Sequence, residues 1–178
     1  MKMVLVYTSD GNVYLKMNGD YLSGNVADNF SAAVQAWPNA SSKITATTTT
    51  FANSNLDFTT ATQSSWDAIM QGYTYSATGY CLATSTDGIE LTSLANAKAS
   101  SKLIQYAGLI FPPNNISLNL DAAAICAMCH EIGHALGLGH SNQDYYPTTE
   151  DSIMRYDGYT SKYYTPQAHD INDINNKY

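Results

Sequence analysis

The sequence predicts an α+β fold, and three observations carry that prediction. Apolar residues recur at helical spacing over residues 26–37, which indicates an amphipathic helix. Residues 13–17 and 43–51 instead have the composition of strands. A long apolar helix follows Asp121. With 178 residues, the chain can form one domain that buries about 70% of the surface of its unfolded state.

The amino-terminal elements are a strand and a helix. The predicted strand covers Val13–Met17, and the turn residues Asn18-Gly19-Asp20 end it. The helix that follows has one apolar face, and Pro38 closes it. The residues of that face are Val26, Ala27, Phe30, Ala33, Val34 and Trp37.

The middle of the chain gives weaker signals. Lys43–Phe51 is a predicted strand, because its run of threonines is β-branched. Only short elements are expected between residues 52 and 99, and a clearer strand follows the loop at Pro112-Pro113. These further elements are a turn at Trp66–Met70 and strands at Tyr73–Tyr75, Tyr80–Thr84 and Ile116–Leu120.

Two more helices complete the prediction. Asp121 can cap the long helix, since a carboxylate accepts backbone hydrogen bonds at a helix start. Thr165 and Pro166 supply an N-cap and a first-turn proline for the last helix. The apolar face of the last helix consists of Ile171, Ile174 and Tyr178.

The charge balance argues against two classes of partner. The net charge is −7 with only eight Lys and Arg residues, so we expect no binding to nucleic acid or to a membrane. The longest apolar run, Ala122–Cys129, is too short to span a bilayer. Val4–Val6 is likewise too short for the apolar core of a signal peptide. The abundance of Ser, Thr, Asn and Tyr nevertheless favours a secreted protein whose export signal is absent from this sequence.

The three cysteines leave their chemical state open. Cys126 and Cys129 lie at i and i+3 on the long helix, where small buried apolar residues are the favoured interpretation. A disulfide between Cys81 and one of them is the next alternative. A second metal site is the least favoured, because His169 is the only other histidine.

Residues 130–140 read His-Glu-x-x-His-x-x-Gly-x-x-His. On a helix, His130 and His134 lie only about 40° apart, so both imidazoles can bind one zinc ion at roughly 2.0–2.1 Å. His140 could not join them on a continuous helix, because it would lie about 9 Å further along the axis. Gly137 is placed to reverse the chain, since glycine adopts the left-handed conformation that ends many helices.

Three histidine ligands leave the fourth zinc position open, as in catalytic zinc sites. Zinc there lowers the pKa of a water molecule to about 7. We expect Glu131 to be the general base that takes a proton from this water, which implies hydrolysis of a peptide bond. Glu150, Asp144 and Asp151 are alternative ligands, but each leaves the spacing from Gly137 to His140 unexplained.

Residues 121–178 resemble the metzincin clan of zinc endopeptidases, whose signature is this motif followed by a turn that contains methionine. His140-Ser141 and the ending from Thr165 to Tyr178 are similar to the matrixins. The resemblance implies an α+β fold with a mixed twisted sheet, an active-site helix and a second helix. It implies a single catalytic domain over residues 1–178, with an upper part to about residue 137 and a small irregular lower part from about 138 that ends in a helix.

The resemblance also implies roles for residues around the metal. Met154 would lie beneath the zinc ion without binding it, and a peptide would bind extended in the cleft, against an edge strand. Met154-Arg155-Tyr156 is more similar to astacins and serralysins, in which this tyrosine can bind zinc and support the oxyanion. Tyr156 is therefore a candidate fifth ligand, with a wall residue as the alternative.

Other metal sites are not predicted in detail. The second, structural zinc site of matrixins needs several histidines outside the motif. This chain has only His169 there, which we interpret as an exposed residue of the last helix, so we expect no such site. Calcium, which matrixins often bind, has no assigned site. The scattered aspartates form no spaced loop, and they are Asp20, Asp28, Asp57 and Asp87.

The leading interpretation is a secreted, monomeric zinc endopeptidase with one catalytic Zn²⁺ and a peptide or protein substrate. The alternative is a secreted binding or adhesion module, weak or inactive in catalysis, on the same scaffold. Cleavage that stops when a chelator is added would separate the two.

Overall fold

A five-stranded sheet lies at the centre of the computed structural model, which describes residues 11–71, 77–85, 104–113, 118–141, 151–155 and 163–178. The strand order is β2-β1-β3-β5-β4. Strands β2, β1, β3 and β5 run parallel, and β4 pairs antiparallel with β5. The strands are β1 (Val13–Tyr21), β2 (Ile44–Thr48), β3 (Leu56–Thr60), β4 (Tyr80–Ser85) and β5 (Ile104–Phe111).

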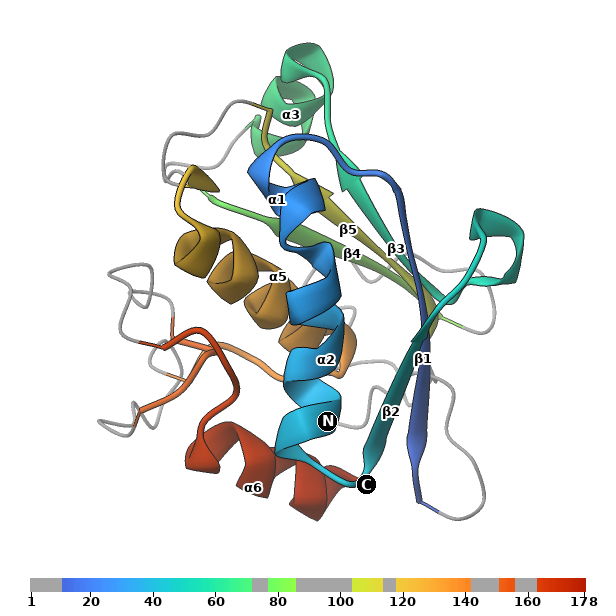
Figure 1. The fold of residues 1–178 in the computed structure, drawn as a ribbon, viewed down its shortest axis with the longest axis vertical. Helices are drawn as coiled ribbons and strands as arrows, with labels where there is room; N and C mark the ends of the chain where they lie inside the picture. The colour runs from blue at the N-terminus through green and yellow to red at the C-terminus, as the bar shows by residue number, and fades with distance from the viewer. Residues whose placement is uncertain (1–10, 72–76, 86–103, 114–117, 142–150, 156–162) are drawn as a thin grey trace.

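Helices cover one face of this sheet, as Figure 1 shows. Helix α2 packs against both β2 and α5, and α5 packs against β4 and β5. A smaller helix, α6, lies beneath α2 and α5 in this view. The helices are α1 (Asn25–Asp28), α2 (Phe30–Ala40), α3 (Gln63–Met70), α5 (Asp121–Ala135) and α6 (Ala168–Lys177), with a 3₁₀ turn η1 (Phe51–Asn53).

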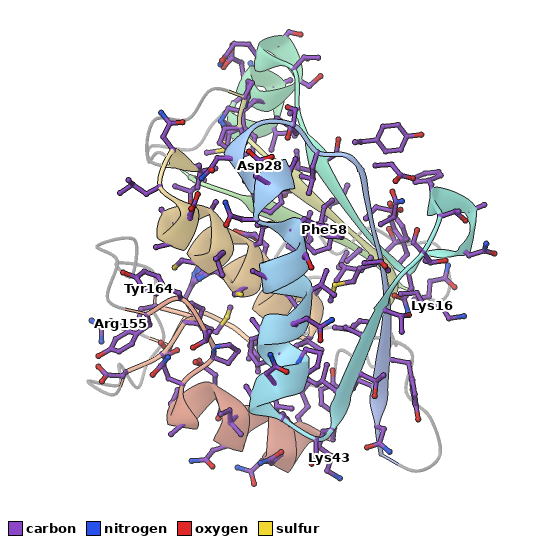
Figure 2. The ribbon with its side chains drawn as sticks, in the orientation of Figure 1. Lys16, Asp28, Lys43, Phe58, Arg155 and Tyr164 are labelled. Atoms are coloured by element: carbon purple, nitrogen blue, oxygen red, sulfur yellow. The ribbon has the colours of Figure 1, made fainter. Side chains whose placement is uncertain are left out.

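The core fills the layer between the sheet and the helices. Along β1 the residues alternate, so that Val13, Leu15 and Met17 are buried while the side chains between them are exposed. Phe58 of β3 lies in this layer, with its ring 5.0 Å from that of Phe30 on α2 (Figure 2). Burial of this apolar face is the main force that holds α2 and α5 against the sheet.

Several predicted elements have different limits. Strand β1 continues to Tyr21, so Asn18-Gly19-Asp20 forms part of the strand and not a turn. The single helix predicted over 26–37 is two helices, because Asn29 leaves the helical conformation between them, with φ −102° and ψ 3°. Pro38 lies inside α2 and does not close it. Only Ile44–Thr48 of the predicted strand at 43–51 is a strand.

Other predictions were wrong in kind. Trp66–Met70 belongs to helix α3, which begins where the Thr62 side chain accepts a hydrogen bond from the Ser65 amide. Of the strand expected at Ile116–Leu120, the structure describes Leu118–Leu120, which is not a strand: Leu118 has 3₁₀ conformation and a bend follows it. Strand β4 confirms Tyr80–Thr84, whereas Tyr73–Tyr75 lies outside the described residues. Strands β3 and β5 were not predicted at all.

Both predicted helix caps also differ. Asp121 is the first residue of α5, and its carboxylate accepts a hydrogen bond from the side-chain Nδ2 of Asn29 at 3.1 Å in place of capping the helix. Helix α6 begins after Gln167, not at Thr165-Pro166. Gln167 and Asp170 form a capping box there, in which the Asp170 carboxylate accepts a hydrogen bond from the Gln167 amide at 2.7 Å.

The cysteines are free thiols in this structure, so the disulfide alternative is not supported. Cys126 and Cys129 are buried in the core, as the favoured interpretation predicted. Among the described residues, no helix combines the length and apolar character that crossing a membrane requires.

Candidate metal centre

Helix α5 carries the first two histidines of the motif and ends at Ala135, so that the chain can turn and bring His140 back toward them. Gly137 adopts φ 80°, the left-handed conformation that was predicted from its spacing. Around it the Leu138 amide donates to Gly133 O at 2.9 Å, and the Gly137 amide donates to His134 O at 2.8 Å. This pair of hydrogen bonds is a Schellman motif, which stops the helix and turns the chain toward His140.

The three imidazoles converge on one point. The Nε2 atom of His140 lies 3.1 Å from Nε2 of His130 and 3.2 Å from Nε2 of His134. Two nitrogens bound to one tetrahedral zinc ion at roughly 2.0–2.1 Å would be about 3.3 Å apart. The ligand-atom spacing of this cluster therefore fits a zinc ion, and among the described residues no other set of three such side chains gathers in this way.

Hydrogen bonds to the other ring nitrogens determine the protonation of two histidines. Nδ1 of His130 donates to the Ile153 carbonyl at 2.8 Å, and Nδ1 of His134 donates to the Leu138 carbonyl at 2.9 Å. A carbonyl can only accept, so each proton lies on Nδ1 and each Nε2 presents a lone pair. Lone pairs that face one another at this distance repel, and a bound cation removes that repulsion.

Burial keeps these imidazoles neutral. The pKa of His134 is lowered to about 4, by burial first and by the neighbouring His140 second. The pKa of His130 also lies well below its ordinary value, because of burial first and of His134 second. Neutral imidazoles are the form that binds metal, so the centre needs no proton release from these rings at neutral pH.

Glu131 lies beside the cluster but is not part of it. Its side chain is only 3% exposed, and burial raises its pKa to about 8. Gly79, directly before β4, makes room for it: a Cβ at that position would lie 2.7 Å from both Cγ and Oε1 of Glu131. The carboxyl group therefore lies between the histidine helix and the start of the edge strand.

The turn Ser152–Met154 lies against the other side of the centre and is held by a residue that sequence reasoning missed. Asp170 of α6 is 1% exposed and accepts hydrogen bonds from Ser152 Oγ at 2.5 Å and from the Ile153 amide at 2.9 Å. Because Ile153 O in turn accepts from His130, Asp170 positions a partner of the first histidine. The spacing of Gln167 and Asp170 indicates a capping box, but no local signal predicts the contact with Ser152.

Met154 is buried against α5 at Gly133, which is the second variable position of the motif. Gly133 is required there, because a Cβ on it would overlap the Met154 sulfur and would lie 3.2 Å from Cζ2 of Trp37. Trp37 itself donates a hydrogen bond to Cys129 O at 3.0 Å. The Met154 side chain can therefore pack this closely against α5 only because residue 133 has no Cβ atom.

Replacing Gly133 with alanine is expected to lower the free energy of unfolding by about 1–3 kcal/mol, because the methyl group overpacks the contact with Met154 and Trp37. Urea unfolding of the metal-free protein would measure it. In an open helical position the same substitution would stabilise by about 0.5–1 kcal/mol. A gain in stability would therefore contradict the packing around Gly133.

The remaining predicted residues lie apart from the cluster or outside the described residues. Asp151 is exposed and does not belong to the cluster, so it is not supported as an alternative ligand. His169 lies 3.6 Å from Asp173 on α6 and is partly exposed. Tyr156, Asp144 and Glu150 fall outside the described residues.

Solved structures supply the comparison that decides the fold. High choriolytic enzyme 1, a hatching enzyme zinc-protease from Oryzias latipes (medaka fish), is 15% identical over 97% of this chain and 92% of its own, with a TM-score of 0.51. The chain has the fold of a zinc metalloprotease. Myroilysin is also similar, at 13% identity over 97% of each chain and a TM-score of 0.52.

This fold confirms the predicted α+β class and the resemblance to zinc metalloproteases. No family model and no curated protein matches the sequence. The matrixin-like subtype stays a prediction.

Proposed function

We propose that this protein is a secreted zinc-dependent endopeptidase. The observation that carries the proposal is the convergence of three histidine Nε2 atoms, with Glu131 buried on the same helix, next to His130 in the sequence. Three protein ligands leave one position for a substrate or water, which distinguishes catalytic zinc sites from structural ones.

His130, His134 and His140 would hold the zinc ion, and their Nδ1 hydrogen bonds would keep the lone pairs aimed at it. When bound, zinc supplies Lewis-acid chemistry, which polarises the scissile carbonyl and acidifies water. A nearby divalent cation also favours the ionised form of Glu131, which burial alone disfavours. The ionised Glu131 would accept a proton from the attacking water at a carboxylate oxygen and deliver it to the leaving amine nitrogen.

Strand β4 is the candidate substrate edge. It is the last strand of the sheet, and among the described residues it pairs only with β5, so its other side can pair with an extended peptide. Gly79 at its start touches Glu131, and a peptide along β4 would therefore pass the proposed base. This placement supports a peptide or protein substrate bound extended in the cleft.

Finer features of the proposal follow the metzincin resemblance. The division at about residue 137 would separate an upper part from a lower one, and Met154 would form an apolar base under the metal. Tyr156 would support the oxyanion from the turn that Ser152–Met154 begins. Replacement of Tyr156 by phenylalanine would then lower turnover more than it weakens zinc binding.

Removal of the metal tests the whole proposal. We expect the purified protein to contain one zinc ion per chain and to cleave members of a peptide library. Cleavage should stop after treatment with a chelator and return when one equivalent of Zn²⁺ is added, because the ion supplies the Lewis acid. Mass spectrometry of the products measures both the loss of cleavage and its return. A protein that holds zinc but cleaves nothing in the library would favour the binding or adhesion module.

A further inference from the structure

The place where α5 ends has backbone carbonyls that the helix cannot satisfy. The last carbonyls of any helix lack partners within it. The Schellman motif uses those of Gly133 and His134. The carbonyls of Leu136 and Gly137, the two residues that follow the helix, form a pair that we call the corner.

The last residue of α6 and the residue after it satisfy both carbonyls of the corner. Lys177 Nζ donates to Gly137 O at 2.7 Å, and the Tyr178 hydroxyl donates to Leu136 O at 2.9 Å. The ammonium also lies over the Tyr178 ring, 6.0 Å from its centre, at the outer limit of cation–π attraction. Two adjacent residues thus hold two adjacent carbonyls, although they lie 40 and 42 positions further along the chain.

The corner determines where two of the three histidines lie. It is followed at once by Leu138, whose carbonyl orients His134 through Nδ1. Two residues later comes His140, whose Nε2 lies within 3.2 Å of both other Nε2 atoms. A shift of the corner would therefore disturb the orientation of His134 and the position of His140 together.

Stability alone does not explain a lysine at this place. Burial lowers the pKa of Lys177 to about 8, although Asp173 opposes the change. Its folded-state pKa is thus depressed, so the charged form at neutral pH costs stability that an uncharged side chain would not cost. What the ammonium supplies is a charged hydrogen bond to Gly137 O, at the helix end where a positive charge is favourable.

We propose that Lys177 and Tyr178 are positioning residues of the metal centre, which hold the Leu136–Gly137 corner and thereby set its affinity for zinc. The proposal rests on the zinc site of the proposed function but not on proteolysis. It assigns these two residues no contact with metal or substrate.

Zinc affinity tests the proposal directly. Lys177→Met and Tyr178→Phe are each expected to weaken Zn²⁺ binding about tenfold or more, as loss of such supporting hydrogen bonds does in other metal sites. Competition with a fluorescent chelator would measure the Kd. Lys177→Arg should restore most of the affinity, because it keeps a donor, and Asn176→Ala, exposed on the same helix, should leave it unchanged.

Two further readouts separate positioning from loss of fold. Urea unfolding of the metal-free variants should change little for Tyr178→Phe, which removes a single oxygen atom. The visible spectrum of the Co²⁺-substituted variants should change, because it reports ligand geometry at the metal. Zinc affinity and a Co²⁺ spectrum equal to those of the unsubstituted protein in both variants would overturn the proposal.

The result is also separable from the fate of the proposed endopeptidase. A protein that binds zinc more weakly in both variants but never cleaves peptides would overturn only the proteolytic function. A protein that cleaves peptides and keeps its zinc affinity in both variants would overturn only the positioning role.

Discussion

Replacement of Glu131 by glutamine is expected to remove peptide hydrolysis while the protein still binds one zinc ion. Glu131 lies outside the histidine cluster, so its loss takes away no metal ligand. Glutamine has the same shape in the buried space beside Gly79, but its amide cannot accept a proton. General base catalysis contributes about 10²–10⁴-fold, and kcat/KM should fall by at least this factor.

The measurement pairs a peptide cleavage assay with zinc analysis of the same sample. Asp151→Asn is the matched control, since it makes the same kind of change at an exposed carboxylate outside the cluster and should retain full activity. Undiminished cleavage by Glu131→Gln would remove Glu131 from the mechanism. Loss of zinc together with activity would instead indicate that Glu131 holds the site together.

Replacement of Asp170 by alanine is expected to have the largest effect on stability. Asp170 accepts hydrogen bonds from Ser152 Oγ, from the Ile153 amide and from the Gln167 amide, the last at 2.7 Å. Each buried donor left without a partner costs about 1–3 kcal/mol, so the free energy of unfolding should fall by about 3 kcal/mol or more. Zinc affinity should fall as well, because Ile153 then no longer holds His130 firmly.

Urea unfolding of the metal-free protein measures the first effect, and chelator competition measures the second. Asn172→Ala on the exposed side of α6 is the control and should change neither. A fall of less than about 1 kcal/mol for Asp170→Ala would mean that water replaces the lost acceptor. In that case Asp170 would have no part in holding the Ser152–Met154 turn.

The metal centre was predictable where it depends on local rules. The helical period places His130 and His134 on one face, and the left-handed preference of glycine gives Gly137 its role. Both rules act within a few residues, so they can be applied to the spacing of the motif alone. The ring geometry of the histidines then follows from the helix and its end.

Contacts between distant segments could not be predicted in the same way. Asp170 and Ser152 are 18 residues apart, and nothing in either local sequence indicates the other. The spacing of apolar residues did indicate the face of α6 that buries Ile174, but not that a carboxylate of that helix would enter the core. Only the packing of α6 against the turn reveals this.

Strands β3 and β5 were missed by the prediction for a related reason. Strand β3 contains Asp57, which is only 6% exposed and accepts a hydrogen bond from Ser54 at 2.5 Å. A buried aspartate interrupts the apolar pattern by which strands are recognised. Strand β5 contains Gly108, a residue that weakens strand propensity although it pairs with Asp57 in the sheet. Pairing in the sheet overrides both local signals.

Helix α6 holds no zinc ligand, yet it supports the Ser152–Met154 turn at its start and the Leu136–Gly137 corner at its end. This arrangement has a consequence for synthesis. The three histidines are synthesised before residues 168–177, so the ligands are complete while their supports are still missing. We therefore expect an ordered metal centre only after α6 has been translated and has packed, which would delay any cleavage until that point.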